Sequence, residues 1–100
     1  MMDDYPTDDD LAKITEWDAA DPLGLVEYLR GLWTYPEYFK TSGKRVIRLE
    51  LHTGGWSGNE DIITALGKTI FWSIFWEKSK RGGHYYFKIP SQWAIKAATK

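Results

Sequence analysis

Residues 52–63, HTGGWSGNEDII, place two glycines ahead of an apolar run, and loops of this kind often bind phosphate where a helix begins. A Walker-type loop ends in Gly-Lys-Ser/Thr, because its lysine contacts the terminal phosphates and its hydroxyl contacts magnesium. Here Asn59, Glu60 and Asp61 occupy the expected first turn, where two carboxylates would repel a phosphate. The glycine spacing also differs from the dinucleotide-binding pattern. The stretch is therefore not expected to bind a nucleotide.

A turn that connects a strand to a helix accounts for the residue types of 52–63. Gly54 and Gly55 permit positive φ angles after a strand, and Ser57 with Glu60 has the sequence pattern of a capping box. The stretch is therefore predicted to be a strand-to-helix corner. Trp56 at its tip either packs against the sheet or is exposed as a contact for a partner.

The chain has two histidines, His52 and His84. We expect them at the end of one strand and the start of another, where they could be neighbours, with Glu50, Glu60 or Asp61 able to complete a ligand set. Neither histidine has the spacing of a common metal site, such as two histidines four residues apart on a helix. No metal site is therefore predicted.

The chain lacks the residues and motifs that usually carry nucleophilic catalysis. The Gly-x-Ser-x-Gly pattern is absent, and the chain has no cysteine to serve as a thiolate nucleophile or in a disulfide. We therefore expect a protein that is not an enzyme and has no cofactor. The absence of cysteine fits a reducing compartment. The chain has no apolar run of about 18 residues and an acidic N-terminus unlike a signal peptide, so we expect a cytoplasmic protein without membrane contact.

The stretch at residues 77–88, EKSKRGGHYYFK, combines bases with aromatic residues around two glycines. Such a combination suits single-stranded nucleic acid, because cations contact phosphates and ring faces stack on bases. Two alternatives are open: a hairpin whose charges only keep its tip solvated, or a protein-binding surface, since Tyr and Arg are common at binding hot spots. The residues concerned are Lys78, Lys80, Arg81, His84, Tyr85, Tyr86 and Lys88.

Charge is divided between the two halves of the chain. Residues 1–37 contain ten acids and two bases, a net charge of −8, whereas residues 38–100 contain eleven bases and four acids, a net charge of +7. Two interpretations are open. Either the halves pack together and partly neutralise each other, or the chain presents an acidic arm and a basic binding face.

Two helices are predicted in the first half of the chain. The polar and acidic residues 1–10 are expected to form a mobile tail, and residues 11–100 a single domain. The end of the tail doubles as a helix start, with Thr7 as N-cap of a helix over 8–20. A second helix over 21–33 begins with an Asp-Pro pair, a common start signal.

The second half of the chain predicts a sheet. Apolar and polar residues alternate over 44–53, with Ile47, Leu49 and Leu51 on one side, as in a strand with one buried face. Residues 69–78, rich in β-branched and aromatic side chains, are expected to form a hairpin with 84–90. The other predicted elements are a helix over 59–68, ended by Gly67, and a terminal helical turn over 91–100 docked by Trp93 and Ile95.

The predicted order is therefore α-α-β-α-β-β, followed by the terminal helical turn. This order predicts an α+β fold, a small three-stranded, mainly antiparallel sheet with helices packed on one face. Because residues 69–78 carry large side chains on both sides, they should form the central strand, or else one side is a docking surface.

Two sequence blocks resemble those of a known group of proteins. TGGWSGNE at 53–60 and RGGHY at 81–85, separated by an aromatic stretch, are similar to blocks in small uncharacterised proteins encoded by bacteriophages and prophages. The resemblance covers about residues 49–90. It implies a phage or prophage origin without a particular mechanism, and small phage accessory proteins often bind host machinery.

The composition and the resemblance together predict a protein-interaction module of a phage or prophage. Such an accessory protein would bind a host or phage protein and could inhibit a host or defence complex, as anti-CRISPR proteins do. The alternative is a nucleic-acid-binding module that uses residues 78–88. The oligomeric state is left open. The candidate partner-binding residues are Trp56, Lys80, Arg81, His84, Tyr86, Asp8, Asp9 and Asp10.

Overall fold

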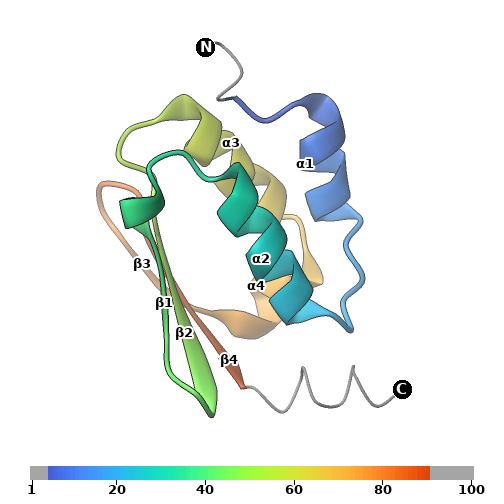
Figure 1. Cartoon of the computed structure of the whole chain (residues 1–100), viewed down its shortest axis with the longest axis vertical. Helices are drawn as coiled ribbons and strands as arrows, with labels where there is room; N and C mark the ends of the chain where they lie inside the picture. Colours follow the sequence, from blue (N-terminus) through green and yellow to red (C-terminus); the bar gives the residue numbers. More distant parts are fainter. Residues whose placement is uncertain (1–4, 91–100) are drawn as a thin grey trace.

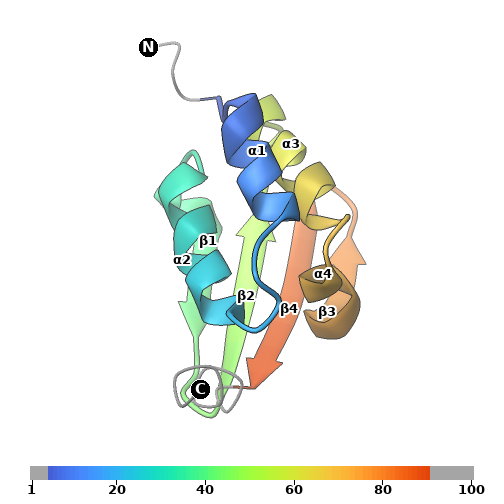
Figure 2. The same ribbon diagram turned by 90° about the vertical axis from the view of Figure 1, so that its right-hand side faces the viewer.

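The computed structural model describes residues 5–90, in which helices lie on one face of a four-stranded antiparallel sheet (Figure 1). Figure 2 shows all of these helices on the same side of the strands. The α+β class and the one-sided helical layer are therefore confirmed. The elements are α1 (Asp8–Thr15), α2 (Pro22–Leu32), the 3-10 turn η2 (Pro36–Tyr38), β1 (Phe39–Ser42), β2 (Val46–His52), α3 (Ser57–Leu66), α4 (Ile70–Phe75), β3 (Trp76–Lys80) and β4 (His84–Pro90).

The sheet has the strand order β1-β2-β4-β3, and every neighbouring pair is antiparallel. Its two central strands are β2 and β4, which are paired over their whole length from Val46 opposite Pro90 to His52 opposite His84. The predicted three-stranded sheet with residues 69–78 at its centre is therefore wrong. The strand over 44–53 and the hairpin partner over 84–90 are confirmed.

The strand that sequence reasoning missed is β1. Pro36 stands three residues before it, and of its four residues, Phe39 to Ser42, only Phe39 is large and apolar. Phe39 is buried opposite Leu51, and this contact fixes β1 at the edge of the sheet. A strand this short is stabilised by its neighbour more than by its own composition.

Residues 69–78 form a helix and then an edge strand. The hydroxyl of Thr69 caps α4 by accepting a hydrogen bond from the backbone N–H three residues later (3.2 Å). Phe71 and Phe75, one turn apart, are buried, whereas Ile70 and Ile74, about 100° away around the helix axis, are exposed. The large side chains that would lie on both sides of a strand over residues 69–78 therefore lie at different positions around a helix.

The first two helices begin where the sequence predicts. Thr7 and Asp10 form a capping box: the Thr7 hydroxyl accepts from the Asp10 N–H (3.0 Å), and the Asp10 carboxylate accepts from the Thr7 N–H (2.9 Å). Asp21 caps α2. Residues 8–10 of the predicted tail are therefore the first turn of α1, which ends at Thr15, earlier than predicted. The predicted terminal helical turn lies outside the described residues.

The inner face of the sheet and the apolar sides of the helices form one core. Leu49, Leu51 and Phe87 come from the two central strands and are at most 1% exposed. Burial of each such side chain contributes about 1.5–3 kcal/mol. A slip of one residue between the strands would turn them all to the opposite face, so the core fixes the register and the outer face together. The helices contribute Ile14, Leu25, Leu29, Ile62, Leu66, Phe71 and Phe75.

The capping box makes the free energy of unfolding depend on pH. The hydrogen bond from the Thr7 N–H, opposed in part by desolvation, lowers the pKa of Asp10 below its ordinary value. Its stabilisation is present above the unfolded-state pKa and is lost as the pH falls through the lower folded-state pKa. The stability difference between the wild type and Asp10→Asn should therefore shrink between pH 6 and pH 2.5 in urea titrations.

Asp9→Asn is the matched control, because it removes the same charge from the same helical turn without touching the capping box. It should change the stability less. A stability difference for Asp10→Asn that stays constant over this pH range would contradict the assignment.

Candidate functional site

The two glycine-rich blocks meet at one end of the sheet. The backbone N–H of Thr53 donates to the Gly83 carbonyl (2.9 Å), and the Thr53 side chain is buried. A Cβ atom at Gly83 would collide with the Thr53 hydroxyl, and φ there is 83°, so the position requires glycine. Gly54 and Gly55 also have positive φ angles, as predicted. The blocks therefore form one structural corner.

The predicted capping box at Ser57 and Glu60 is wrong. Trp56 is the N-cap of α3, no side chain caps this helix, and Ser57 is exposed. The corner is held instead by Asn59, which is 1% exposed. Its side chain accepts from the Thr34 N–H (3.0 Å) and donates to the carbonyls of Thr34 (3.0 Å) and Thr53 (3.4 Å). Asn59 thus joins the two loops at this end of the sheet.

Trp56 is a packed residue and not a free contact. Its ring lies 5.3 Å from the ring of Tyr5 and 6.0 Å from that of Tyr35, centroid to centroid, and the residue is half-buried. Its indole nitrogen is buried and has no hydrogen-bond partner among the described residues. Tyr35 has a left-handed backbone (φ 66°), a strained conformation for a residue other than glycine. The exposed aromatic residues at this corner are Tyr5, Tyr35 and Tyr38.

The outer face of the sheet is the surface that the described helices leave uncovered (Figures 1 and 2). Because side chains alternate along a strand, burial of Leu49 and Phe87 directs their neighbours outward. The outward residues include five bases and two acids, a net charge of +3 without the histidines. They are Lys40, Arg48, Lys78, Lys80 and Lys88, with Glu50, Glu77, His52, His84 and Tyr86 among them.

Acids of the first half of the chain lie on the helical layer, opposite this basic face. Asp8, Asp9 and Asp10 are in the first turn of α1, and Glu27 is in α2. The ion pairs found within residues 5–90 do not join the two halves of the chain. They link Glu27 with Arg30 (3.2 Å), Glu50 with His52 (3.3 Å) and Glu77 with Lys88 (3.0 Å). Of the two interpretations of the charge division, a separate basic face fits this arrangement better.

Tyr86 lies at the centre of the outer face. The ammonium groups of Lys78 and Lys80 lie 5.2 and 5.5 Å from the centre of its ring, and the His52 ring contacts it edge-on at 5.9 Å. Beside it is a hollow of about 240 Å³, lined by Arg48, Leu49, Glu50, Glu77, Lys78, Tyr86 and Phe87. An aromatic ring thus lies beside two exposed ammonium groups on the outer face.

Glu77 and Lys88 form an ion pair on this face. The hydrogen bond from Lys88 is the main reason that the pKa of Glu77 lies below its ordinary value, and the charges of Lys78 and Arg48 act in the same direction. Lys88 is therefore partly neutralised, which leaves Lys78 and Lys80 as the better candidates for binding an anion.

His52 and His84 are neighbours, as predicted. They are directly opposite on β2 and β4, and their Nδ1 atoms are 2.7 Å apart. Glu50 Oε1 lies 3.3 Å from His52 Nε2. Glu60 and Asp61 lie on α3 and do not join them, and within residues 5–90 no group of three His, Cys, Asp or Glu side chains could hold a metal ion.

The predicted partner-binding residues fall into separate regions. Lys80, His84 and Tyr86 come together on the outer face, and Arg81 is exposed in the adjoining hairpin turn. Asp8 to Asp10 lie on the helical side, where Asp10 is occupied by the capping box and by the Tyr28 hydroxyl (3.3 Å). Sequence reasoning missed Lys40 and Arg48, because only the strand pairing places Lys40 opposite Glu50 and Arg48 opposite Lys88.

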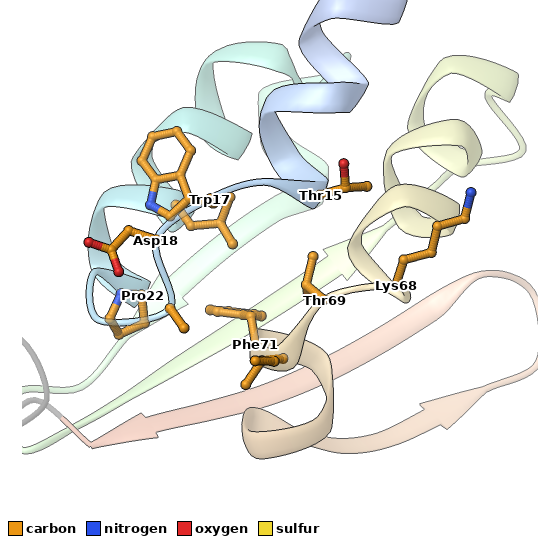
Figure 3. Close-up of a pocket in the computed structure, with 10 residues that line it drawn as sticks. Thr15, Trp17, Asp18, Pro22, Lys68, Thr69 and Phe71 are labelled. Atoms are coloured by element: carbon orange, nitrogen blue, oxygen red, sulfur yellow. The ribbon is translucent and has the colours of Figure 1, made fainter.

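A pocket of about 140 Å³ lies on the helical side, between the end of α1, the start of α2 and the α3–α4 connection (Figure 3). Its two charged side chains, Asp18 and Lys68, lie on opposite sides and point away from each other. They do not form an acid–base pair, and the remaining lining residues are mostly apolar. The outer sheet face therefore carries more charged, histidine and tyrosine side chains than this pocket does.

Comparison with protein-family models, curated proteins and solved structures gave no match for this chain. The phage or prophage resemblance of residues 49–90 stays a prediction. No helix within residues 5–90 has the length and apolar character needed to cross a membrane.

Asn59 and Ser57 provide a matched test of what holds the glycine-rich corner. Asn59→Ala removes the three hydrogen bonds of a buried side chain and should lower the free energy of unfolding by about 1–3 kcal/mol. Ser57→Ala alters an exposed residue without a capping bond and should change it by less than about 0.5 kcal/mol. Urea unfolding measures both. A larger loss for Ser57→Ala than for Asn59→Ala would contradict this assignment and favour the capping box.

Proposed function

We propose that the outer face of the sheet binds single-stranded nucleic acid. The observation that carries this proposal is the position of Tyr86, at the centre of an uncovered basic face with Lys78 and Lys80 beside its ring. A base can stack on the ring, while the two ammonium groups move a short distance to contact the phosphates on either side. This is the nucleic-acid alternative of the sequence, now extended from the hairpin to the whole face.

A single strand fits this surface better than a duplex. The outer face consists of strands only, and the described residues place no helix or protruding ribbon there that could enter a groove. An open sheet instead presents ring faces to unstacked bases, and base–aromatic stacking contributes about 1–3 kcal/mol per base. The hollow beside Tyr86 gives a displaced base a place to lie.

The acids on the helical layer support binding from one side. A phosphate chain is attracted to the outer face and repelled by the first turn of α1, so the charge division orients the protein on its ligand. The salt bridge between Glu77 and Lys88 weakens this attraction locally and concentrates it near Lys78 and Lys80.

Fluorescence anisotropy with labelled 12-nucleotide oligo-dT and oligo-U tests this proposal between 20 and 200 mM salt. Lys78→Gln combined with Lys80→Gln should weaken binding and reduce the slope of log K against log salt by about 1.4, or 0.7 for each phosphate contact. The matched control, Lys13→Gln with Lys68→Gln, removes the same charge from the helical side and should have little effect.

Tyr86 tests the stacking part of the same proposal. Tyr86→Ala should cost about 1–3 kcal/mol of binding free energy, whereas Tyr86→Phe keeps the ring and should bind as the wild type does. No binding at 20 mM salt, or equal loss with the two double lysine variants, would overturn the proposal.

A second function, binding of a host or phage protein, is favoured by an exposed apolar strip on α4 and the start of β3. Ile70 and Ile74, one turn apart, are 61% and 48% exposed, and Trp76, the first residue of β3, is 45% exposed. Burial of such side chains against a partner is favourable. This strip, and not Trp56, is the better contact for the accessory role that the phage resemblance implies.

Ile70→Ser combined with Ile74→Ser tests this second function. The double variant should lose the proteins that the wild type captures from a nuclease-treated bacterial lysate, while the Lys78→Gln and Lys80→Gln variant retains them. Capture that is unchanged in the isoleucine variant would contradict a protein contact at this strip.

A further inference from the structure

We infer that His52 and His84 form a binding site for one divalent transition-metal ion of the kind that prefers imidazole ligands. The two residues are opposite each other on the central strands, and their Nδ1 atoms approach to 2.7 Å. His52 is largely buried, with 17% of its side chain exposed, so its ring has little freedom to turn away. This inference does not depend on nucleic-acid binding.

The neighbouring carboxylate determines how the protons are placed. Glu50 Oε1 lies 3.3 Å from His52 Nε2, and an ionised carboxylate can only accept a hydrogen bond. The proton of neutral His52 is therefore on Nε2, and its Nδ1 lone pair points to His84. In the metal-free protein, His84 Nδ1–H donates to that lone pair. When the proton of His84 moves to its own Nε2, two lone pairs converge on the same point.

The geometry suits an ion after a small adjustment. Two Zn–N bonds of about 2.0–2.1 Å at a tetrahedral angle place their nitrogens roughly 3.3 Å apart, so the rings must separate by roughly 0.6 Å. The strand pairing keeps both residues at this end of the sheet, and rotation about the side-chain bonds supplies the adjustment. Glu50 on the far nitrogen of His52 is the outer carboxylate that commonly orients a metal-bound histidine.

The site offers two protein ligands and leaves the other positions to water. Within residues 5–90 no third His, Cys, Asp or Glu side chain completes the set. Lys80, which is paired with His84, and Lys78 oppose a cation by charge repulsion, and Glu50 offsets part of it. These features favour Cu²⁺, Ni²⁺ and Zn²⁺, which bind imidazole strongly, over Mg²⁺ and Ca²⁺, which prefer oxygen ligands.

The composition of the chain allows imidazole-dependent metal binding to be assigned to particular residues. His52 and His84 are its only histidines, and it has no cysteine, so imidazole-dependent binding by an untagged protein must use these two residues. Isothermal titration with Cu²⁺, Ni²⁺ and Zn²⁺ chlorides should show one ion per chain, with Cu²⁺ the tightest, and Mg²⁺ should show none. His52→Ala and His84→Ala should each weaken binding at least tenfold.

Two further variants separate a metal site from a structural contact. Glu50→Gln should weaken metal binding about tenfold, and Lys80→Gln should strengthen it by removing a repelling charge. The imidazole signals in long-range ¹H–¹⁵N NMR spectra should shift on addition of Zn²⁺, and circular dichroism checks that each variant is folded. Absence of binding, or folded histidine variants that bind as tightly as the wild type, would overturn the inference.

Discussion

Pairing of β2 with β4 is the interaction on which the rest of the structure depends. These strands are separated by more than thirty residues in the sequence, from His52 to His84, yet they form the centre of the sheet. Their inward side chains form the centre of the core, and their outward side chains form the middle of the basic face. The same pairing brings the two glycine-rich blocks together, where Thr53 contacts Gly83. The register of the β2–β4 pair therefore determines the core, the glycine-rich corner and the candidate site on the outer face.

Coverage of a single face of the sheet divides the molecule chemically. The helical layer carries Asp8, Asp9, Asp10 and Glu27 of the first half of the chain, and the open face carries five bases of the second half, which are Lys40, Arg48, Lys78, Lys80 and Lys88. Mutual neutralisation would stabilise the fold but would leave little field at the surface. Separation of the two signs of charge onto opposite faces keeps a positive potential on the outer face, and Tyr86 adds an aromatic ring to that face. A surface with these two properties suits a flexible polyanion with aromatic bases.

Local signals in the sequence predicted local structure well. The Thr7 and Asp21 caps, the alternation around Leu49 and the glycine-rich turns all lie where their residue types indicate. The stretch from Ile70 to Phe75 misled the prediction, because five of its six residues are large and apolar and therefore fit the period of a strand as well as that of a helix.

The candidate site was predicted mainly where its residues are close in sequence. Lys80, His84 and Tyr86 belong to one hairpin, so their grouping could be predicted. Lys40, Arg48 and Glu50 reach the same face through long-range pairing, which local patterns do not specify. The proximity of His52 to His84 was expected from their places at strand ends, and Glu50 lies two residues from His52 on the same strand, so alternation alone places both on one face.

The most direct test of the central claim is to map the oligonucleotide contact by ¹H–¹⁵N correlation NMR of the labelled protein, titrated with unlabelled 12-nucleotide oligo-dT at low salt. The account predicts that the largest shifts cluster on β2, β4 and β3 around Tyr86, and that the amides of α1 and α2 change little. Shifts concentrated on the helical layer, or none on the sheet, would contradict it.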